Sequence, residues 1–153
     1  MEEINLPVSF FFNINFLGEK ITKNGFQSIT GLSVDIETET LKEGGENRFT
    51  HVLPVSTKYD PLILKRGLVK DPEMVKWTKD AILHFDIRPM DLIVNLLTYR
   101  RNNNQSQTSV PLMTWKVINA WPKKWSMSEF NAEQSSLAIE SLELNYSYFE
   151  AMQ

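Results

Sequence analysis

Apolar and polar residues alternate along much of this chain, and the pattern is clearest near the C-terminus. Leu142, Leu144, Tyr146 and Tyr148 share one parity, while serine, glutamate and asparagine fill the positions between them. Side chains alternate across a β-strand, so this pattern predicts a strand with one buried face and one face in water. We therefore expect the stretch 136–149 to belong to the core of a sheet.

The same alternation predicts several more strands. They cover residues 8–16, 32–40, 49–55, 62–70, 92–97 and 110–125. The stretch 92–97 is apolar on both parities, which is typical of a strand in the centre of a sheet. Pro122 lacks a backbone donor, so we expect the hydrogen-bond ladder to break or to reach an edge there.

One segment has the period of a helix instead. Asp71 can cap its N-terminus, and Pro72 suits the first helical position. The apolar residues that follow lie on one helical stripe: Met74, Trp77, Ala81, Ile82 and Phe85. This spacing predicts a helix over about residues 72–85 whose apolar face packs on a sheet. The periodicity as a whole predicts a mainly β protein with one helix.

Length and charge exclude several classes of protein. The chain has 153 residues, which suits a single domain over 1–153, and its net charge of −3 provides no basic groove for nucleic acid. The start, Met1-Glu-Glu, lacks the basic and apolar segments of a signal peptide, and no stretch is long enough to span a bilayer. We expect a protein made in the cytoplasm, without sequence-specific nucleic-acid binding or stable membrane anchoring.

Residues suited to catalysis or metal binding are sparse. There are no cysteines, and the two histidines, His51 and His84, lie on different elements outside any metal-ligand motif. The pair Gly44-Gly45 lacks the Gly, Lys and Ser or Thr that complete a phosphate-binding loop. The sequence therefore predicts no catalytic residue, no metal site, no cofactor and no enzymatic activity.

Three tryptophans, Trp115, Trp121 and Trp125, lie within one predicted strand. Their strand parity beside aliphatic residues favours a place in the core. The alternative is a glycan-binding β-sandwich that stacks sugars on these three rings. Fluorescence that shifts on addition of sugars would distinguish the second interpretation from the first.

The stretch 32–40 carries two different faces. One face holds Leu32, Val34 and Ile36, and the other holds Asp35, Glu37 and Glu39. Carboxylates in a row repel one another unless water surrounds them, so we expect the acidic face to be solvated. The loop 42–48 that follows is rich in glycine and charge, which is typical of a hairpin tip and also of a binding loop.

Short motifs occur in a fixed order between Pro7 and Phe149. They are Gly31-Leu32-Ser-Val-Asp-Ile-Glu, Glu43-Gly-Gly-Glu-Asn-Arg, Leu64-Lys-Arg-Gly-Leu, Trp77, Trp115 with Asn119-Ala-Trp-Pro, Phe130-Asn-Ala and Ile139-Glu-Ser-Leu-Glu-Leu. Together they resemble the tail tube proteins of contractile phage tails and phage-derived injection particles. The resemblance implies a β-sandwich or small barrel with one flanking helix.

The same resemblance implies a structural function. Such proteins form hexameric rings that stack into the rigid inner tube of a contractile particle, a conduit for DNA or for protein cargo. The chain is then the main tube protein or the paralogue that initiates the tube, in a phage tail or an exported injection particle. The implied partners are other copies of the chain, the contractile sheath protein, baseplate or spike proteins and tube-terminating proteins.

The resemblance also implies roles for two groups of residues. The loop matched to a subunit-contacting loop of the family contains Gly44, Gly45, Glu46, Asn47, Arg48 and Phe49. We further hypothesise that Asp35, Glu37 and Glu39 face the lumen of the tube. An acidic lining would keep DNA or other cargo from adhering to the wall.

Overall fold

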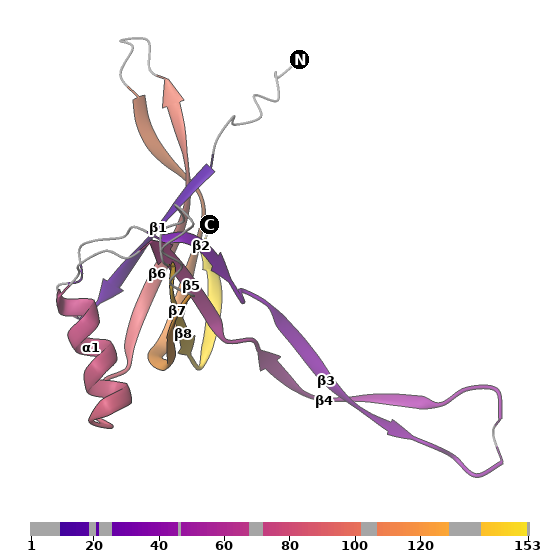
Figure 1. The fold of residues 1–153 in the computed structure, drawn as a ribbon. Coiled ribbons are helices and arrows are strands. Elements are labelled where there is room, and N and C mark those ends of the chain that lie inside the picture. Colours follow the sequence, from indigo (N-terminus) through magenta and orange to yellow (C-terminus); the bar gives the residue numbers. More distant parts are fainter. Residues whose placement is uncertain are drawn as a thin grey trace, which may run out of the picture.

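The computed structural model describes residues 10–18, 21, 26–45, 47–67, 72–101, 107–128 and 139–152. Nine strands and one helix occur in these ranges (Figure 1). They are β1 (Phe10–Leu17), β2 (Phe26–Thr30), β3 (Val34–Leu41), β4 (His51–Tyr59), β5 (Leu62–Gly67), α1 (Pro72–Leu83), β6 (Met90–Arg101), β7 (Gln107–Met127), β8 (Ile139–Asn145) and β9 (Tyr148–Met152). The prediction of a mainly β protein with one helix is confirmed.

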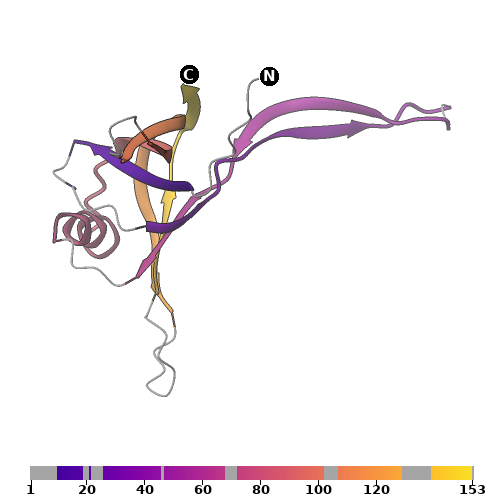
Figure 2. The same ribbon diagram turned by 90° about the horizontal axis from the view of Figure 1, so that it is seen from above.

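Seven of these strands form one antiparallel sheet. Its order is β1-β6-β7-β8-β5-β2, and β9 pairs with β7 beside this path. The long strand β7 pairs with β6 and β9 through its first half and with β8 through its second half. The sheet therefore turns back on itself around an interior, as Figure 2 shows from above. The strand register shifts at Pro122, where the sequence predicts a break in the ladder.

The interior is filled from both halves of the sheet. Ile14, Leu64, Leu92, Val117 and Leu144 are all fully buried, and each comes from a different strand. They occupy the parity that the alternation assigns to the buried face. β6 lies between β1 and β7, which confirms the central position predicted for the doubly apolar stretch 92–97.

The helix α1 covers one side of this barrel and packs near β7. Met74, Trp77 and Ala81 are buried, and the Trp77 ring meets the Phe16 ring edge-on with centroids 5.8 Å apart. The rest of the predicted stripe is wrong. Ile82 and Phe85 are exposed, because the helix ends at Leu83 and Phe85 turns away with a φ of 54°. Asp71, the predicted cap, lies outside the described residues.

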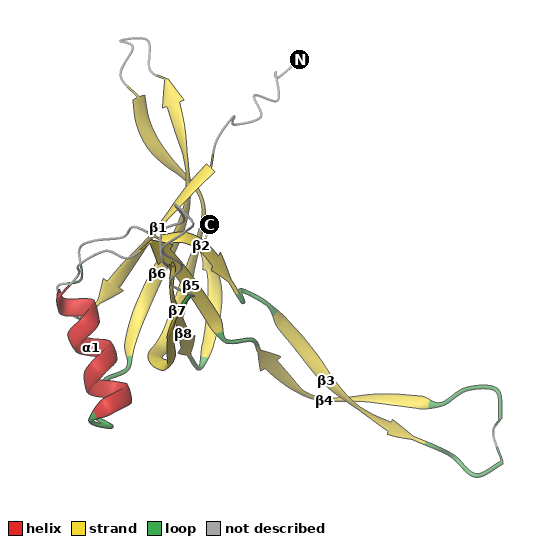
Figure 3. Ribbon diagram, viewed as in Figure 1, coloured by secondary structure: helices red, strands yellow, loops and turns green. Residues whose placement is uncertain are grey.

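The remaining two strands, β3 and β4, form a sheet of their own. This hairpin continues from β2 and β5 and extends far from the barrel, in yellow with green connections in Figure 3. Every residue of β3 is exposed. Val34 and Ile36, on the apolar parity of the predicted strand 32–40, are therefore outside the core of the single chain.

Candidate assembly hairpin

The β3–β4 hairpin has two chemically different faces. Residues directly opposite each other in an antiparallel pair share a face. The register therefore defines an apolar face composed of Val34, Ile36, Thr38, Thr40, Val52, Pro54, Thr57 and Tyr59. The opposite, acidic face is composed of Asp35, Glu37, Glu39, Leu41, His51, Leu53, Ser56 and Lys58.

The apolar face contacts water in the single chain. Ile36 is 62% exposed and Val52 is 60% exposed, and Val55, at the bulge in this hairpin, is 62% exposed. A two-stranded hairpin is marginally stable in water by itself. Contiguous apolar side chains on such an element indicate a surface that another molecule covers.

Polar contacts on the acidic face are loose and solvated. The Ser56 hydroxyl donates to Glu37 at 3.1 Å, and the Lys58 ammonium lies 3.9 Å from the same carboxylate. Asp35 and Glu39 are exposed on this face as well. Exposed pairs of this kind contribute only about 0–1 kcal/mol each. The same face also exposes the apolar side chains of Leu41 and Leu53.

The joint between hairpin and barrel is narrow and tightly packed. Gly31 adopts a φ of 97°, and a Cβ atom added there would lie 1.9 Å from the carbonyl oxygen of Pro61. Only glycine fits a left-handed backbone with so close an approach. Next to it, the Asp60 amide donates to the Ser33 carbonyl at 3.2 Å, and the Ser33 hydroxyl donates to the Asp60 carboxylate at 2.6 Å.

Aromatic side chains anchor this joint to the barrel. The Tyr146 hydroxyl donates to the Gly31 carbonyl at 3.1 Å, and the Tyr59 ring meets Tyr146 and Phe149 edge-on at 6.1 and 5.2 Å. Burial, with the nearby Asp60 carboxylate and Tyr59, raises the pKa of the Tyr146 phenol to about 12. These contacts fix the direction in which the hairpin leaves the barrel.

The loop predicted to contact neighbouring subunits lies at the far end of the hairpin. Gly44 and Gly45 form a turn, and a Cβ atom at either position would meet nothing within 4 Å. Phe49 is exposed and its ring lies edge-on to the His51 ring at 5.0 Å. Glu46 lies outside the described residues. The hairpin thus places this loop as far from the barrel as the chain reaches (Figure 1).

The tryptophans of β7 are all only partly exposed. Trp115 and Trp125 pack against the core, and the Trp125 indole donates to Glu140 at 2.7 Å. The other oxygen of Glu140 accepts from the buried Arg66 at 2.9 Å. Two of the three rings are therefore engaged in packing, an arrangement unlike an open sugar-stacking platform.

The described residues contain no cluster of three or more His, Asp or Glu side chains that could hold a metal ion. In the same ranges, no helix is long and apolar enough to cross a membrane. The described surfaces that are suited to binding another molecule are the hairpin and the unpaired edges of the sheet. Among the described strands, β1 pairs only with β6, β2 only with β5 and β9 only with β7.

A small barrel with a protruding apolar hairpin and unpaired sheet edges has the features of a structural module that binds other copies or other chains. Comparison with known families makes this class specific. The family described as T4-like virus tail tube protein gp19 matches residues 8–150, and the chain belongs to this family. It is a tail tube protein, a structural protein of the inner tube of contractile tails and injection systems. No curated protein matches the chain.

Solved structures agree with this assignment. The chain is 28% identical to a chain of the anti-feeding prophage (AFP) baseplate, with 95% of this chain and 94% of the other covered and a TM-score of 0.78. A chain of the PVC extracellular contractile injection system, from its sheath-tube complex in the extended state, is 23% identical at a TM-score of 0.71, with coverages of 99% and 93%. Hcp1 from Flavobacterium johnsoniae shares the fold at 11% identity, with a TM-score of 0.56 and coverages of 92% and 93%.

Proposed function

We propose that this chain forms closed hexameric rings that stack into the inner tube of a contractile particle. The observation that carries the proposal is the β3–β4 hairpin, whose apolar face is exposed in the single chain. Family membership supplies the class of partner, because a tube is built from copies of one protein. The 6-fold symmetrised baseplate that contains a 28%-identical chain supports rings of six.

The unpaired strands support ring closure. β1 is eight residues long and rich in phenylalanine, and it pairs on one side only among the described strands. A long apolar edge of this kind aggregates unless another strand or element covers it. Closing six copies into a ring pairs or covers every such edge and leaves none free.

The tip loop and the acidic face then have separate roles. Gly44, Gly45, Glu46, Asn47, Arg48 and Phe49 contact neighbouring subunits, and the position of this loop at the end of the hairpin supports that role. Asp35, Glu37 and Glu39 line the lumen, which the solvation of the acidic face supports. A lumen of this charge repels DNA and acidic cargo. A ring map with these carboxylates on the outer wall would exclude that orientation.

The tube acts inside a larger particle, with a sheath around it, a baseplate at one end and a terminating cap at the other. Relatives solved as sheath-tube complexes, baseplates and tube terminators support these partners. The match to a baseplate chain supports a place in the first ring of the tube. Copy number per particle tests this last point, because an initiator ring contributes six chains while the main tube contributes many rings.

Electron microscopy of the purified protein over a range of concentrations tests the proposal. Rings with a central hole are expected, and their fraction should rise with concentration because assembly follows mass action. A chain that stays monomeric at high concentration and is absent from sheathed particles would contradict the proposed function.

A further inference from the structure

The end of helix α1 carries a second exposed apolar surface. Leu83 is 65% exposed and Phe85 is 84% exposed, with Ile82 beside them at 38%. We call these three residues the helix-end patch. Their exposure separates them from Met74, Trp77 and Ala81, the buried residues of the same helix. Apolar side chains exposed this close together in the sequence, at the end of one helix, mark a candidate contact surface.

The backbone holds this patch in an unusual conformation. Phe85 has a φ of 54°, in the left-handed region that glycine ordinarily occupies at helix ends. A bulky side chain costs energy there, and such strain is found at functional sites. A glycine would end the helix at lower cost.

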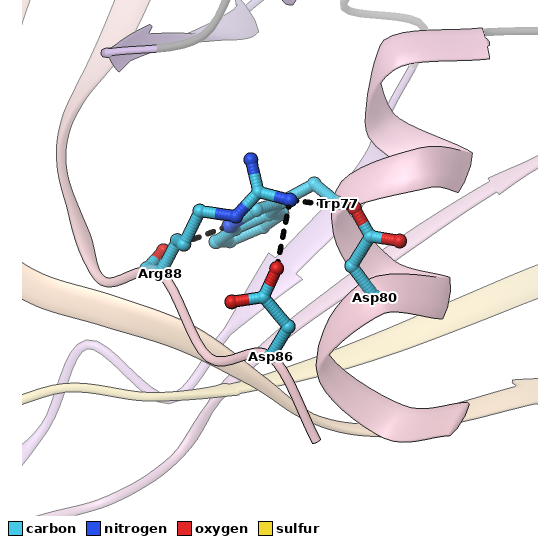
Figure 4. Close-up of polar contacts among 4 residues, drawn as sticks. All are labelled: Trp77, Asp80, Asp86 and Arg88. Carbon is cyan, nitrogen blue, oxygen red and sulfur yellow. Dashed lines mark hydrogen bonds and ion pairs between the residues drawn. The ribbon is translucent and has the colours of Figure 1, made fainter. Parts of the chain in front are cut away.

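The segment after the helix is fixed rather than loose. The Asp86 amide donates to the Asp80 carbonyl at 2.8 Å. One guanidinium nitrogen of Arg88 bridges Asp80 at 2.7 Å and Asp86 at 3.1 Å, and the Trp77 indole donates to the Arg88 carbonyl at 2.9 Å (Figure 4). Phe85 lies within this clamped turn. The patch is therefore presented in one orientation, which lowers the entropy cost of binding.

The hairpin and the helix lie on opposite sides of the barrel. Figures 1 and 2 both show α1 on one side and the β3–β4 hairpin leaving from the other. A head-to-tail contact between identical chains joins two different surfaces of the subunit, and rings and stacks are built from such contacts. A protruding element on one side and a receiving patch on the other have the arrangement that this symmetry requires.

The two surfaces also match in chemistry. The apolar face carries Ile36 and Val52, which are β-branched, and the helix-end patch carries leucine, isoleucine and phenylalanine. The acidic face of the hairpin lies on the reverse side, so it stays solvated when the apolar face is covered. Lys76 and Lys79 are exposed on the helix just before the patch, so the charge beside the patch is opposite in sign to that of the hairpin carboxylates.

We infer that the apolar face of the β3–β4 hairpin docks on the helix-end patch, formed by Ile82, Leu83 and Phe85, of another copy of the chain. The inference rests on the proposed self-assembly and names the receiving surface for the hairpin. Phe85 is the anchor of that surface.

Cysteine cross-linking tests this contact cleanly, because the chain has no cysteine of its own. One variant carries Ile36→Cys and a second, differently tagged variant carries Phe85→Cys. The two are co-assembled together with wild-type chain, because each substitution removes a side chain of the proposed contact, and are treated with a short bismaleimide. Each chain holds a single thiol, so a product that carries both tags joins two copies. We expect this mixed dimer to be the main product in assembled material.

Two matched controls define the face and the patch. Glu37→Cys lies next to Ile36 but on the acidic face, and paired with Phe85→Cys it should give little product. Leu112→Cys is an exposed apolar position on β7, away from the helix, and it should give little product with Ile36→Cys. Stronger linkage of Ile36→Cys to Leu112→Cys than to Phe85→Cys would overturn the inference.

A substitution at Phe85 separates packing from strain. Phe85→Gly removes the ring and relieves the left-handed backbone, so the melting temperature of the unassembled chain should be unchanged or higher. Loss of one buried aromatic contact should raise the concentration needed for assembly roughly tenfold or more. Phe85→Leu keeps an apolar side chain and should assemble more readily than Phe85→Gly.

The outcomes distinguish this inference from the proposed function. If wild-type rings form while Phe85→Gly assembles like wild type and Ile36→Cys fails to link to Phe85→Cys, the docking site is wrong and the tube function stands. If wild-type rings never form, the proposed function itself fails. A mixed dimer together with weakened assembly of Phe85→Gly supports both.

Discussion

The barrel and the β3–β4 hairpin follow the same alternating pattern but meet different surroundings. In the barrel, Leu64 and Leu144 lie on the apolar parity and are completely buried by the chain's own strands. In the hairpin, Val34 and Ile36 lie on the apolar parity and are largely exposed. The difference teaches that alternation encodes a face to be covered. Topology decides whether the same chain or another copy covers it.

The largest effect is expected at the joint between the two regions. Gly31→Ala places a Cβ atom against the Pro61 carbonyl in a left-handed backbone, and the loss of stability should exceed about 4 kcal/mol. Gly44→Ala, in open space at the hairpin tip, is the matched control and should melt like wild type. Thermal denaturation measures both, and a Gly31→Ala chain of wild-type stability would mean that the joint is not tightly packed.

Charge removal should also separate the two regions. Glu140 in the barrel is buried and accepts from Arg66 and Trp125, so Glu140→Gln removes the negative charge from a buried ion pair and should cost about 3–5 kcal/mol. Glu37→Gln on the hairpin removes an exposed carboxylate and should change stability by less than about 0.5 kcal/mol. Urea unfolding of the two variants measures the contrast, which equal losses would contradict.

Shortening an apolar side chain should have an effect of intermediate size that also differs between the barrel and the hairpin. Leu64→Ala opens a cavity in the barrel and should cost about 2–5 kcal/mol in the unassembled chain. Ile36→Ala should leave that chain within about 0.5 kcal/mol of wild type, because its side chain already meets water. Assembly should respond in the opposite sense, with Ile36→Ala sedimenting as smaller species than wild type. A large loss of stability in unassembled Ile36→Ala would contradict this, because it would show that Ile36 is buried within its own chain.

The smallest effect concerns the tyrosine that anchors the joint. The pKa of Tyr146 is raised to about 12, so its contribution to stability is complete below about pH 10, the unfolded value, and is lost as the pH rises through 12. Tyr146→Phe loses the hydrogen bond to the Gly31 carbonyl, which costs about 1 kcal/mol at neutral pH. The free energy of unfolding of this variant should fall less steeply than that of wild type between pH 10 and 12. Denaturant unfolding of both chains across that pH range measures the difference. An identical pH dependence of the free energy of unfolding in the two chains would contradict the role given to Tyr146.

Much of the barrel could be predicted because its signals are local. Strand parity places Ile14, Leu64 and Leu144 inside without reference to distant parts of the chain. The ordered motifs indicate the family, and the family match agrees. The pair of Arg66 and Glu140 could not be predicted, since the two residues are 74 positions apart. Both lie on the buried parity of their strands, but charged side chains are ordinarily exposed, so parity alone does not pair them.

Two errors in the prediction share one cause. Val34 and Ile36 have the parity of core residues, and Ile82 and Phe85 have the spacing of a buried helical stripe, yet all four are exposed. Periodicity reports that a side chain avoids water, but it does not say which molecule shields it. In the proposed assembly, such residues belong to the subunit contacts. The left-handed turn at Phe85 adds to the error because no glycine marks the end of the helix.

The central claim is that another copy of the chain covers the apolar face of the β3–β4 hairpin. Cysteine labelling of the hairpin before and after assembly tests this claim most directly. Val52→Cys lies on the apolar face and Glu37→Cys on the acidic face, in a chain that has no other thiol. We predict that Val52→Cys reacts rapidly with maleimide in separated chains and is protected in rings, while Glu37→Cys stays reactive in both. Equal reactivity of Val52→Cys in separated chains and in assembled rings would contradict the account.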